Sequence, residues 1–186
     1  CNTFNSIHGR TLPVATGARL ANHDLKVVAE AGDGDCYGEG GNHLLAAIRR
    51  NPDVTLSVHN NQVYALTKGQ ASPTTDPGYK TLLQPQGVAV PPLQALALAV
   101  SQGCSWVGRG FAGQVDHLAE LYKQALSHRG FALVEVLQPC VTFNHVNTYK
   151  WYNERVYEVE KEPGYDPENE LWAYQKAKEW GPRIPI

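Results

Sequence analysis

The chain has 186 residues, of which 42% are hydrophobic and 18% are charged, and its formal net charge is −2. This composition is typical of a globular protein, and the length fits one domain. The slightly negative charge, with no basic stripe interleaved with aromatic residues, argues against a nucleic-acid partner. The longest apolar stretch, residues 91–100, is too short to cross a bilayer, so no membrane partner is expected.

The cysteines and the first residue of the chain bear on its cellular location and on whether the sequence is complete. The four cysteines, at positions 1, 36, 104 and 140, form no Cys-x-x-Cys pair and no spacing typical of a zinc site. Free thiols are the rule in a reducing compartment, so a cytoplasmic location is expected. The chain begins with a cysteine and contains no methionine, so we expect it to be an internal piece of a longer protein.

The first predicted elements are a helix and a strand. Residues 7–22 begin with His8-Gly9-Arg10, which by itself predicts a turn, and continue with a small-residue run suited to a closely packed helix. The apolar run 27–29 then predicts a strand, and it leads into the glycine-rich sequence Gly-Asp-Gly-Asp at residues 32–35, which predicts a turn.

A second strand follows after a helix. Residues 41–50 predict a helix with Leu44, Leu45 and Ile48 on one side, and residues 54–58 predict a strand that ends in Asn60-Asn61. In a strand–turn–helix–strand unit the two polar turns lie together at the carboxyl ends of parallel strands. Open α/β sheets bind their ligands at that edge.

The two turns have the spacing of a known motif. Twenty-five residues separate Gly34 from Asn60, which matches the GDG…NN motif for thiamine diphosphate and magnesium. Mg²⁺ prefers hard oxygen ligands in octahedral geometry, and phosphate oxygens supply part of its shell. Asp33 offers a carboxylate, Asn61 an amide oxygen and Val63 a backbone carbonyl. Gly32 and Gly34 allow the backbone to approach the phosphates closely.

Competing motifs fail at single positions. A dinucleotide fingerprint needs glycine where Tyr37 stands, and a calcium loop counted from Asp33 meets Leu44 where its glutamate belongs. No phosphate-binding loop of the G-x-x-x-x-G-K-[ST] type is present. An ordinary strand-to-helix turn stays open as an alternative, although the spaced asparagine pair on a second strand counts against it.

The middle of the chain predicts a functional loop and the rest of the sheet. Residues 62–75 are polar, rich in hydroxyl groups and contain one lysine, Lys68, which we expect to contact an anion. Residues 76–91 predict a long irregular connection. The following elements are expected to alternate as helix 92–101, strand 105–108, helix 114–128 and strand 131–137. The alternation predicts an α/β fold with a mostly parallel sheet and helices on both faces.

The carboxyl-terminal forty residues are polar and aromatic. Residues 149–159 have apolar side chains at helical intervals, and a second helix is predicted to begin with Asp166 as N-cap and Pro167, and to end at Gly181-Pro182. Three tryptophans, at positions 151, 172 and 180, are expected to pack either on a partner subunit or back on the domain.

Three runs of sequence together resemble one family. They are IHGRTLPVATGARLAN at residues 7–22, GDGDCYGEGGNHLLAAIRRN…NNQVYALTKGQASPTT from Gly32, and LQPCVTFN at residues 137–144. In this order they resemble the β subunits of the 2-oxoacid:ferredoxin oxidoreductases. The resemblance implies a thiamine-diphosphate-binding fold for residues 1–146. Residues 147–186 would be a helical extension, truncated where those proteins continue.

The resemblance also implies a role for individual residues. Mg²⁺ is expected at Asp33, Asn61 and the Val63 carbonyl, and Lys68 is expected to contact the 2-oxo acid. The residues expected to bind the cofactor are His8, Gly32, Gly34, Asp35, Asn60, Ala65 and Leu66. Family members often have glycine where Ala65 stands.

Cys140 is expected to supply one thiolate to a [4Fe–4S] cluster. Such a cluster needs four cysteines, and in the family the other three precede the His-Gly-Arg run. Cys1 lies too close to His8 to be assigned, and Cys36 and Cys104 match no ligand position. The chain is therefore not expected to complete a cluster alone.

The implied activity is the coenzyme A-dependent oxidative decarboxylation of a 2-oxo acid, pyruvate or 2-oxoglutarate, with electrons passed to ferredoxin. The activating glutamate would come from an α subunit, so a heterodimer is expected and an isolated chain should be inactive. One alternative is a subunit of a non-redox thiamine-diphosphate-dependent decarboxylase or carboligase, which would have no use for Cys140. The other is a degenerate scaffolding subunit, against which the intact Asp33, Asn60 and Asn61 argue.

Overall fold

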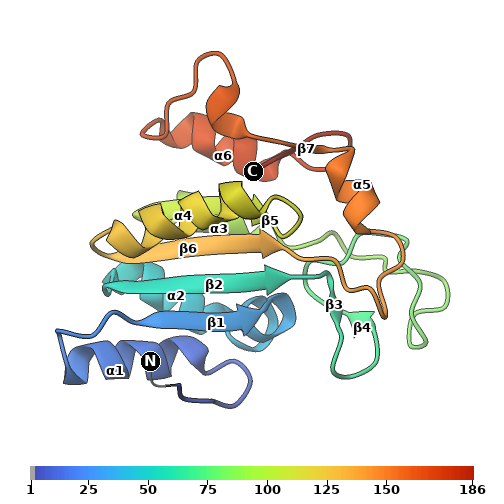
Figure 1. Ribbon diagram of the computed structural model, residues 1–186. Coiled ribbons are helices and arrows are strands. Elements are labelled where there is room, and N and C mark those ends of the chain that lie inside the picture. The colour runs from blue at the N-terminus through green and yellow to red at the C-terminus, as the bar shows by residue number, and fades with distance from the viewer. Residues whose placement is uncertain (1–2) are drawn as a thin grey trace.

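A computed structural model describes residues 3–186, so Cys1 lies outside the described residues. The centre of the fold is a four-stranded, entirely parallel sheet in the order β1-β2-β6-β5 (Figure 1). The strands are β1 (Val28–Gly32), β2 (Val54–Asn60), β5 (Trp106–Phe111) and β6 (Phe131–Leu137). The predicted α/β fold with a parallel sheet is confirmed. β6 has the predicted bounds, and β5 extends to Phe111, beyond the predicted end.

Helices cover both faces of the sheet. They are α1 (Thr11–Ala21), α2 (Gly41–Arg50), α3 (Ala95–Ser101) and α4 (Val115–Ser127). Successive side chains of β6 point to opposite faces: Phe131 and Leu133 join the core under α1, α2 and α3, whereas Ala132 and Val134 join the core under α4. Figure 1 shows α4 in front of β6 and α2 behind β2. All seven residues of β6 are buried because both faces are covered.

Three predictions about these helices are corrected. Leu45 is exposed, although Leu44 and Ile48 on the same helix are buried, because adjacent helical residues point about 100° apart. Val115, predicted on the apolar face of α4, is exposed at the first position of that helix. α3 begins at Ala95, after the predicted start at residue 92, because the Leu93 N–H donates to the Pro73 carbonyl (2.8 Å).

The predicted glycine-rich turn is helical instead. Asp33 has right-handed helical dihedral angles (φ −59°, ψ −43°), and the π-helix η1 (Gly34–Glu39) follows β1 directly. The Gly40 N–H donates to the Asp35 carbonyl (2.9 Å), which is the i→i+5 bond of a π-helix. π-Helical turns occur frequently at functional sites. Regular helix resumes at α2.

The segment 62–75 contains a small hairpin where the sequence predicted a loop. The strands β3 (Val63–Tyr64) and β4 (Gln70–Ala71) pair in antiparallel register. Residues 76–94 contain no helix or strand, so the irregular connection predicted for residues 76–91 is present and extends to the later start of α3. Figure 1 shows the hairpin and this long connection together at the carboxyl ends of the strands.

The carboxyl-terminal segment is less helical than expected. Its elements are α5 (Tyr149–Asn153), β7 (Val156–Tyr157), η2 (Val159–Lys161), α6 (Glu170–Lys178) and β8 (Ile184–Pro185). The predicted helix 149–159 stops after five residues because Val156 and Tyr157 pair with β8. The N-cap of α6 is Asn169, whose Oδ1 accepts from the Trp172 N–H (3.0 Å), and not Asp166, which caps the preceding turn.

This segment packs back on the sheet. Tyr152 and Ile184 form a buried cluster with Phe111 and Leu137, which end β5 and β6, and Trp151 and Trp180 pack against that cluster. Trp172 packs on Tyr165. Trp151 and Trp180 therefore pack back on the domain, whereas Trp172 contacts its own segment.

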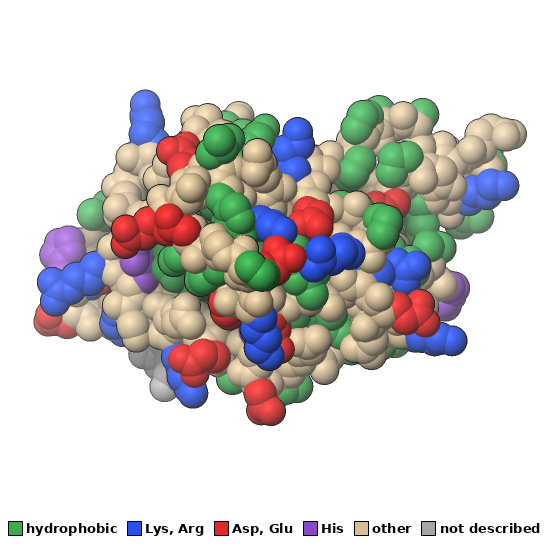
Figure 2. Space-filling view, turned by 90° about the horizontal axis from the view of Figure 1, so that it is seen from above, with side chains coloured by type: hydrophobic (Ala, Val, Ile, Leu, Met, Phe, Trp, Pro, Cys, Tyr) green, Lys and Arg blue, Asp and Glu red, His purple; other side chains and the backbone are tan. Residues whose placement is uncertain are grey.

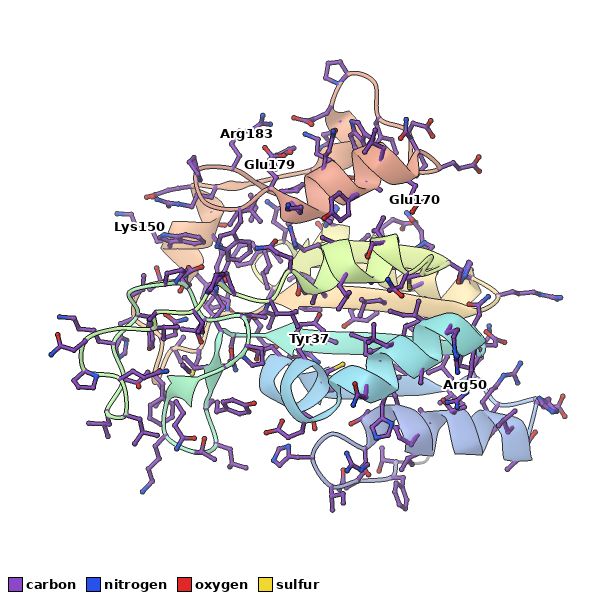
Figure 3. All side chains as sticks on the ribbon, turned by 180° about the vertical axis from the view of Figure 1, so that it is seen from behind. Tyr37, Arg50, Lys150, Glu170, Glu179 and Arg183 are labelled. Carbon is purple, nitrogen blue, oxygen red and sulfur yellow. The ribbon has the colours of Figure 1, made fainter. Side chains whose placement is uncertain are left out.

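The distribution of charged side chains on the surface agrees with the nearly balanced charge of the sequence. Figure 2 shows positive and negative side chains interspersed over the face that contains the carboxyl-terminal segment. There, Lys176 forms ion pairs with Glu162 and Glu179, and Arg183 pairs with Glu162. Arg50 is exposed at the carboxyl end of α2 (Figure 3). Among the helices of residues 3–186, none has the length and apolar character that a bilayer crossing requires.

Candidate functional site

The two turns singled out by the sequence meet at one buried carboxylate. Asp33 follows β1 and is 1% exposed. Its Oδ2 accepts from the hydroxyls of Ser72 (2.5 Å) and Thr74 (2.7 Å), which follow the hairpin. The backbone of Asn61, just past β2, lies close enough to the Asp33 carboxylate to lower the pKa of that group. The strand edge thus gathers Asp33, Asn61 and the hydroxyl-rich loop around one point.

The electrostatics of this point favour a bound cation. Burial raises the pKa of Asp33, and the hydrogen bonds from Ser72 and Thr74 oppose that rise. No ion pair within residues 3–186 includes Asp33. A buried carboxylate without a counter-charge is costly, and a cation placed against it removes that cost.

The donor set fits a hard divalent cation that shares its shell with a ligand. The Asn61 amide oxygen accepts from the Val63 N–H (3.0 Å), so the Asn61 side chain and the Val63 backbone lie together. Within the described residues, no three His, Cys, Asp or Glu side chains gather to hold a metal. Carboxylate, amide and carbonyl oxygens completed by phosphate oxygens are the surroundings that Mg²⁺ prefers. The residues therefore fit Mg²⁺ with a bound diphosphate.

Asp35 ties the amino-terminal loop to η1. Its carboxylate accepts from the Gly9 N–H and from the Thr11 hydroxyl (3.2 Å), and His8 Nδ1 lies 3.4 Å from Asp35 Oδ1. Gly9 has a φ of +73°, and a Cβ at this position would lie 2.7 Å from Glu39. The side chain of His8 is 69% exposed, so it remains free to contact a ligand beside η1.

The two glycines of the motif have different surroundings. A Cβ on Gly34 would lie 2.2 Å from the ring of Tyr64, whose hydroxyl donates to the Gly34 carbonyl (3.2 Å). A Cβ on Gly32 would meet nothing within 4 Å. Burial and the neighbouring Glu39 raise the pKa of Tyr64 to about 12, so its hydroxyl stays a neutral donor. Gly34 is thus required for the hairpin to rest on η1.

The turn of the hairpin presents its side chains outward. Leu66 is 86% exposed, Ala65 is half-buried and Lys68 is exposed. Lys68 has a φ of +75°, in the left-handed region that non-glycine residues seldom adopt, and such residues concentrate at functional sites. No ion pair in the described part of the chain involves Lys68. Its ammonium group is therefore available to an anion.

Cys140 lies half-buried in the loop after β6, and other residues of this loop contact the site. In that loop, Asn144 Nδ2 donates to the Asn61 carbonyl (3.1 Å), and Phe143 packs on Gly69 of the hairpin. Burial raises the pKa of Cys36 to about 12 and that of Cys104 to about 11. Burial thus favours the neutral thiol form of both side chains.

Several residues of the site were missed by sequence reasoning. Ser72 and Thr74 were recognised only as part of a polar loop, and Glu135 was not singled out. A signal for Glu135 was present, since it is the one charged residue in the apolar run FALVEVL, which predicts a strand buried on both faces. Nothing in the sequence pointed to its partner Arg109.

Two family models match the chain and leave little of it uncovered. Residues 1–136 match the thiamine pyrophosphate enzyme, C-terminal TPP binding domain. Residues 140–186 match the C-terminal region of the pyruvate ferredoxin oxidoreductase beta subunit.

Curated relatives agree with both models. The chain is 46% identical over 198 residues to 2-oxoacid:ferredoxin oxidoreductase 1, subunit beta, of Aeropyrum pernix, covering 100% of this chain and 61% of that protein. It is also 46% identical over 141 residues to the 2-oxoglutarate oxidoreductase subunit KorB of Mycobacterium tuberculosis, covering 76% of this chain and 38% of the relative. The chain thus spans less than two thirds of the length of these relatives.

Solved structures share the fold. A 2-oxoglutarate:ferredoxin oxidoreductase from Magnetococcus marinus, with 2-oxoglutarate, coenzyme A and succinyl-CoA bound, superposes with a TM-score of 0.91 at 36% identity, over 96% of this chain and 61% of that one. A thiamine diphosphate-dependent 4-hydroxybenzoylformate decarboxylase from Rhodococcus jostii gives a TM-score of 0.51 at 26% identity, over 74% of this chain and 24% of that one. The chain belongs to the thiamine pyrophosphate enzymes and, among them, to the β subunits of the 2-oxoacid:ferredoxin oxidoreductases.

Proposed function

We propose that this chain binds thiamine diphosphate and Mg²⁺ in a coenzyme A-dependent 2-oxoacid:ferredoxin oxidoreductase. The reaction converts a 2-oxo acid and coenzyme A to an acyl-CoA and CO₂, and passes the electrons to ferredoxin. The observation that carries the proposal is the buried Asp33 carboxylate, which has no counter-charge in the described residues and contacts the Thr74 hydroxyl that also reaches Asn60 Oδ1. The similarity to β subunits of such enzymes supports it.

In this proposal Mg²⁺ is held by the Asp33 carboxylate, the Asn61 amide oxygen and the Val63 carbonyl. Bound thiamine diphosphate would supply the electron sink for decarboxylation, which is chemistry of the cofactor and not of the protein. The contribution of the chain is to fix the diphosphate at the strand edge and to exclude water around Asp33, which strengthens its electrostatic interactions.

The remaining contacts are assigned from the family motifs together with the observed positions. The residues proposed to bind the cofactor are His8, Gly32, Gly34, Asp35, Asn60, Ala65 and Leu66. Lys68, exposed at the hairpin turn and unpaired among the described residues, is proposed to bind the carboxylate of the 2-oxo acid. A lysine ammonium acts there as a point charge with three donors.

Cys140 is proposed to be one ligand of a [4Fe–4S] cluster whose other thiolates lie outside the described residues. An α subunit is proposed to supply the activating glutamate and to close the active site, in a heterodimer that hands electrons to ferredoxin. We also propose that residues 1–146 form the cofactor-binding domain and 147–186 its extension. The free thiols suit a reducing cytoplasm.

The test uses the full-length protein co-expressed with its α subunit and purified without oxygen. Reduction of ferredoxin or a viologen dye is followed with pyruvate or 2-oxoglutarate, with and without coenzyme A. Reduction that requires both the oxo acid and coenzyme A supports the proposal and identifies the substrate. Release of CO₂ without dye reduction would assign the chain to the non-redox decarboxylases instead.

A further inference from the structure

A buried ion pair lies beside the proposed magnesium site. Glu135, in the middle of β6, is 3% exposed, and its Oε2 lies 2.9 Å from Nε of Arg109 on the neighbouring strand β5. Both side chains are almost fully buried. A buried ion pair gains little net stability over apolar residues of similar size, because removing both charges from water is costly. Stability alone therefore gives a weak account of this pair.

The other carboxylate oxygen of Glu135 connects the pair to the site. Glu135 Oε1 accepts from the Tyr37 hydroxyl (3.1 Å) and from Asn60 Nδ2 (3.2 Å). Tyr37 belongs to η1 and lies inside the fold (Figure 3). An ionised carboxylate only accepts hydrogen bonds, so it holds the NH₂ group of Asn60 toward itself and turns the Asn60 oxygen away.

That oxygen faces the groups around Asp33. Asn60 Oδ1 lies 2.9 Å from the Thr74 hydroxyl, which is also 2.7 Å from Asp33 Oδ2. An unbroken line of polar contacts thus runs from Glu135 through Asn60 and Thr74 to the carboxylate proposed to hold Mg²⁺.

Arg109 connects this series of polar contacts to the carboxyl-terminal segment. Its Nη2 donates to the Ala177 carbonyl at the end of α6 (3.2 Å), and its guanidinium carbon lies 5.8 Å from the centre of the Trp180 ring. A cavity of about 30 Å³, lined by Asn60, Arg109, Glu135 and Trp180 among others, adjoins the pair. This volume holds a water molecule but is too small for a substrate.

We propose that Glu135 and Arg109 are positioning residues for the proposed magnesium site. They fix the Asn60 amide and the Thr74 hydroxyl, and through these they set the place of the Asp33 carboxylate. The inference rests on the proposed function, because it concerns the same site. Replacing Glu135 with glutamine puts an NH₂ group either against Arg109 Nε or against the Tyr37 hydroxyl and Asn60 Nδ2, so at least one contact that holds the Asn60 amide in place is lost or weakened.

The experiment measures the Mg²⁺ concentration that half-saturates thiamine diphosphate binding, by calorimetry on the full-length protein with its α subunit. Residues that orient metal ligands from the second layer change metal affinity by about 10-fold to 100-fold when substituted. We expect Glu135→Gln to raise the half-saturating concentration within that range. Asp53→Asn is the matched control: it breaks the ion pair with Arg19 (2.7 Å) just before β2, at the opposite end of the strands.

A double-mutant cycle with Thr74→Val separates positioning from general loosening. If Glu135 acts through Thr74, Thr74→Val raises the half-saturating Mg²⁺ concentration little further once Glu135→Gln is present. The fold-increase in the double variant is then smaller than the product of the fold-increases in the two single variants. If Glu135 only supports the sheet, the two effects multiply, which would overturn the proposal.

Glu135→Gln leaves Arg109 buried without a full counter-charge, and that variant can fail to fold. In that case Tyr37→Phe tests the inference, because it keeps the ion pair and removes only one hydrogen-bond donor to Glu135. We expect it to raise the half-saturating Mg²⁺ concentration by about 2-fold to 10-fold. Unchanged half-saturation in every variant that folds overturns the inference. Absence of Mg²⁺-dependent binding in the wild-type protein would overturn the proposed function itself.

Discussion

Tyr152 offers a sharp test of how the carboxyl-terminal segment is attached to the site. Its ring is 1% exposed and lies 5.4 Å from the ring of Phe111 and 4.9 Å from that of Trp151. Its hydroxyl donates to Gln62 Oε1 (3.3 Å), and Gln62 directly follows the asparagine pair. One side chain therefore joins α5, the end of β5 and the loop that leads to the hairpin.

Removing this ring should be costly. Truncation of a fully buried large aromatic to alanine costs about 3–5 kcal/mol. In a domain of this size each kcal/mol lowers Tm by about 2–4 °C. We therefore expect Tyr152→Ala to lower Tm by about 6–20 °C. Tyr152→Phe keeps the ring and loses one hydrogen bond of about 1 kcal/mol, so its Tm should fall by only about 2–4 °C.

The assay is differential scanning calorimetry of the full-length protein with its α subunit, at one scan rate for all variants. Exposed Tyr149 on the same helix supplies the control: Tyr149→Ala should cost less than Tyr152→Ala. A Tyr152→Ala protein that melts within about 2 °C of wild type would refute the packing of the segment on the strand ends.

Three further predictions concern the site itself. Because burial raises the pKa of Asp33, the metal-free folded protein keeps a proton that the unfolded chain has lost, and its stability falls as pH rises through that pKa. Asp33→Asn should therefore raise Tm of the metal-free protein at pH 7 and remove that pH dependence; a lower Tm in calorimetry would contradict this. Lys68→Gln should lower kcat/KM for the 2-oxo acid by about 10-fold to 100-fold, through a higher KM. The control is Lys80→Gln in the neighbouring exposed loop, which should leave kcat/KM unchanged. Equal kinetics of the two variants would exclude Lys68 from the substrate contact. Cys140→Ser should abolish the electron paramagnetic resonance signal of one reduced cluster, and Cys36→Ser should leave it intact; a full signal in Cys140→Ser would remove Cys140 from the ligand set.

Local pattern was sufficient for the sheet. The run FALVEVL is apolar on both faces, so it predicted β6 to the residue, and the alternation of apolar runs with helical periods predicted parallel strands. The approach of Asp33 to Asn61 follows from the same reasoning, since both residues come at the ends of adjacent parallel strands.

The features that the sequence did not predict are determined by tertiary contacts between separate segments of the chain. Asp166 and Asn169 are equally good N-caps by residue type, so the residue types alone do not predict that Asn169 caps α6. The π-helical path after Asp33 follows from i→i+5 hydrogen bonds, for which the sequence shows no characteristic period. The partners of Glu135 come from separate elements, so a single-strand pattern reveals its burial but not its contacts.

The central claim is that Asp33 anchors Mg²⁺ and thiamine diphosphate at the strand edge. Titration of thiamine diphosphate into the full-length protein, with and without Mg²⁺, tests it directly when wild type is compared with Asp33→Ala. The account predicts Mg²⁺-dependent binding in wild type and none in Asp33→Ala. Binding of equal affinity and equal Mg²⁺ dependence in the two proteins would contradict it.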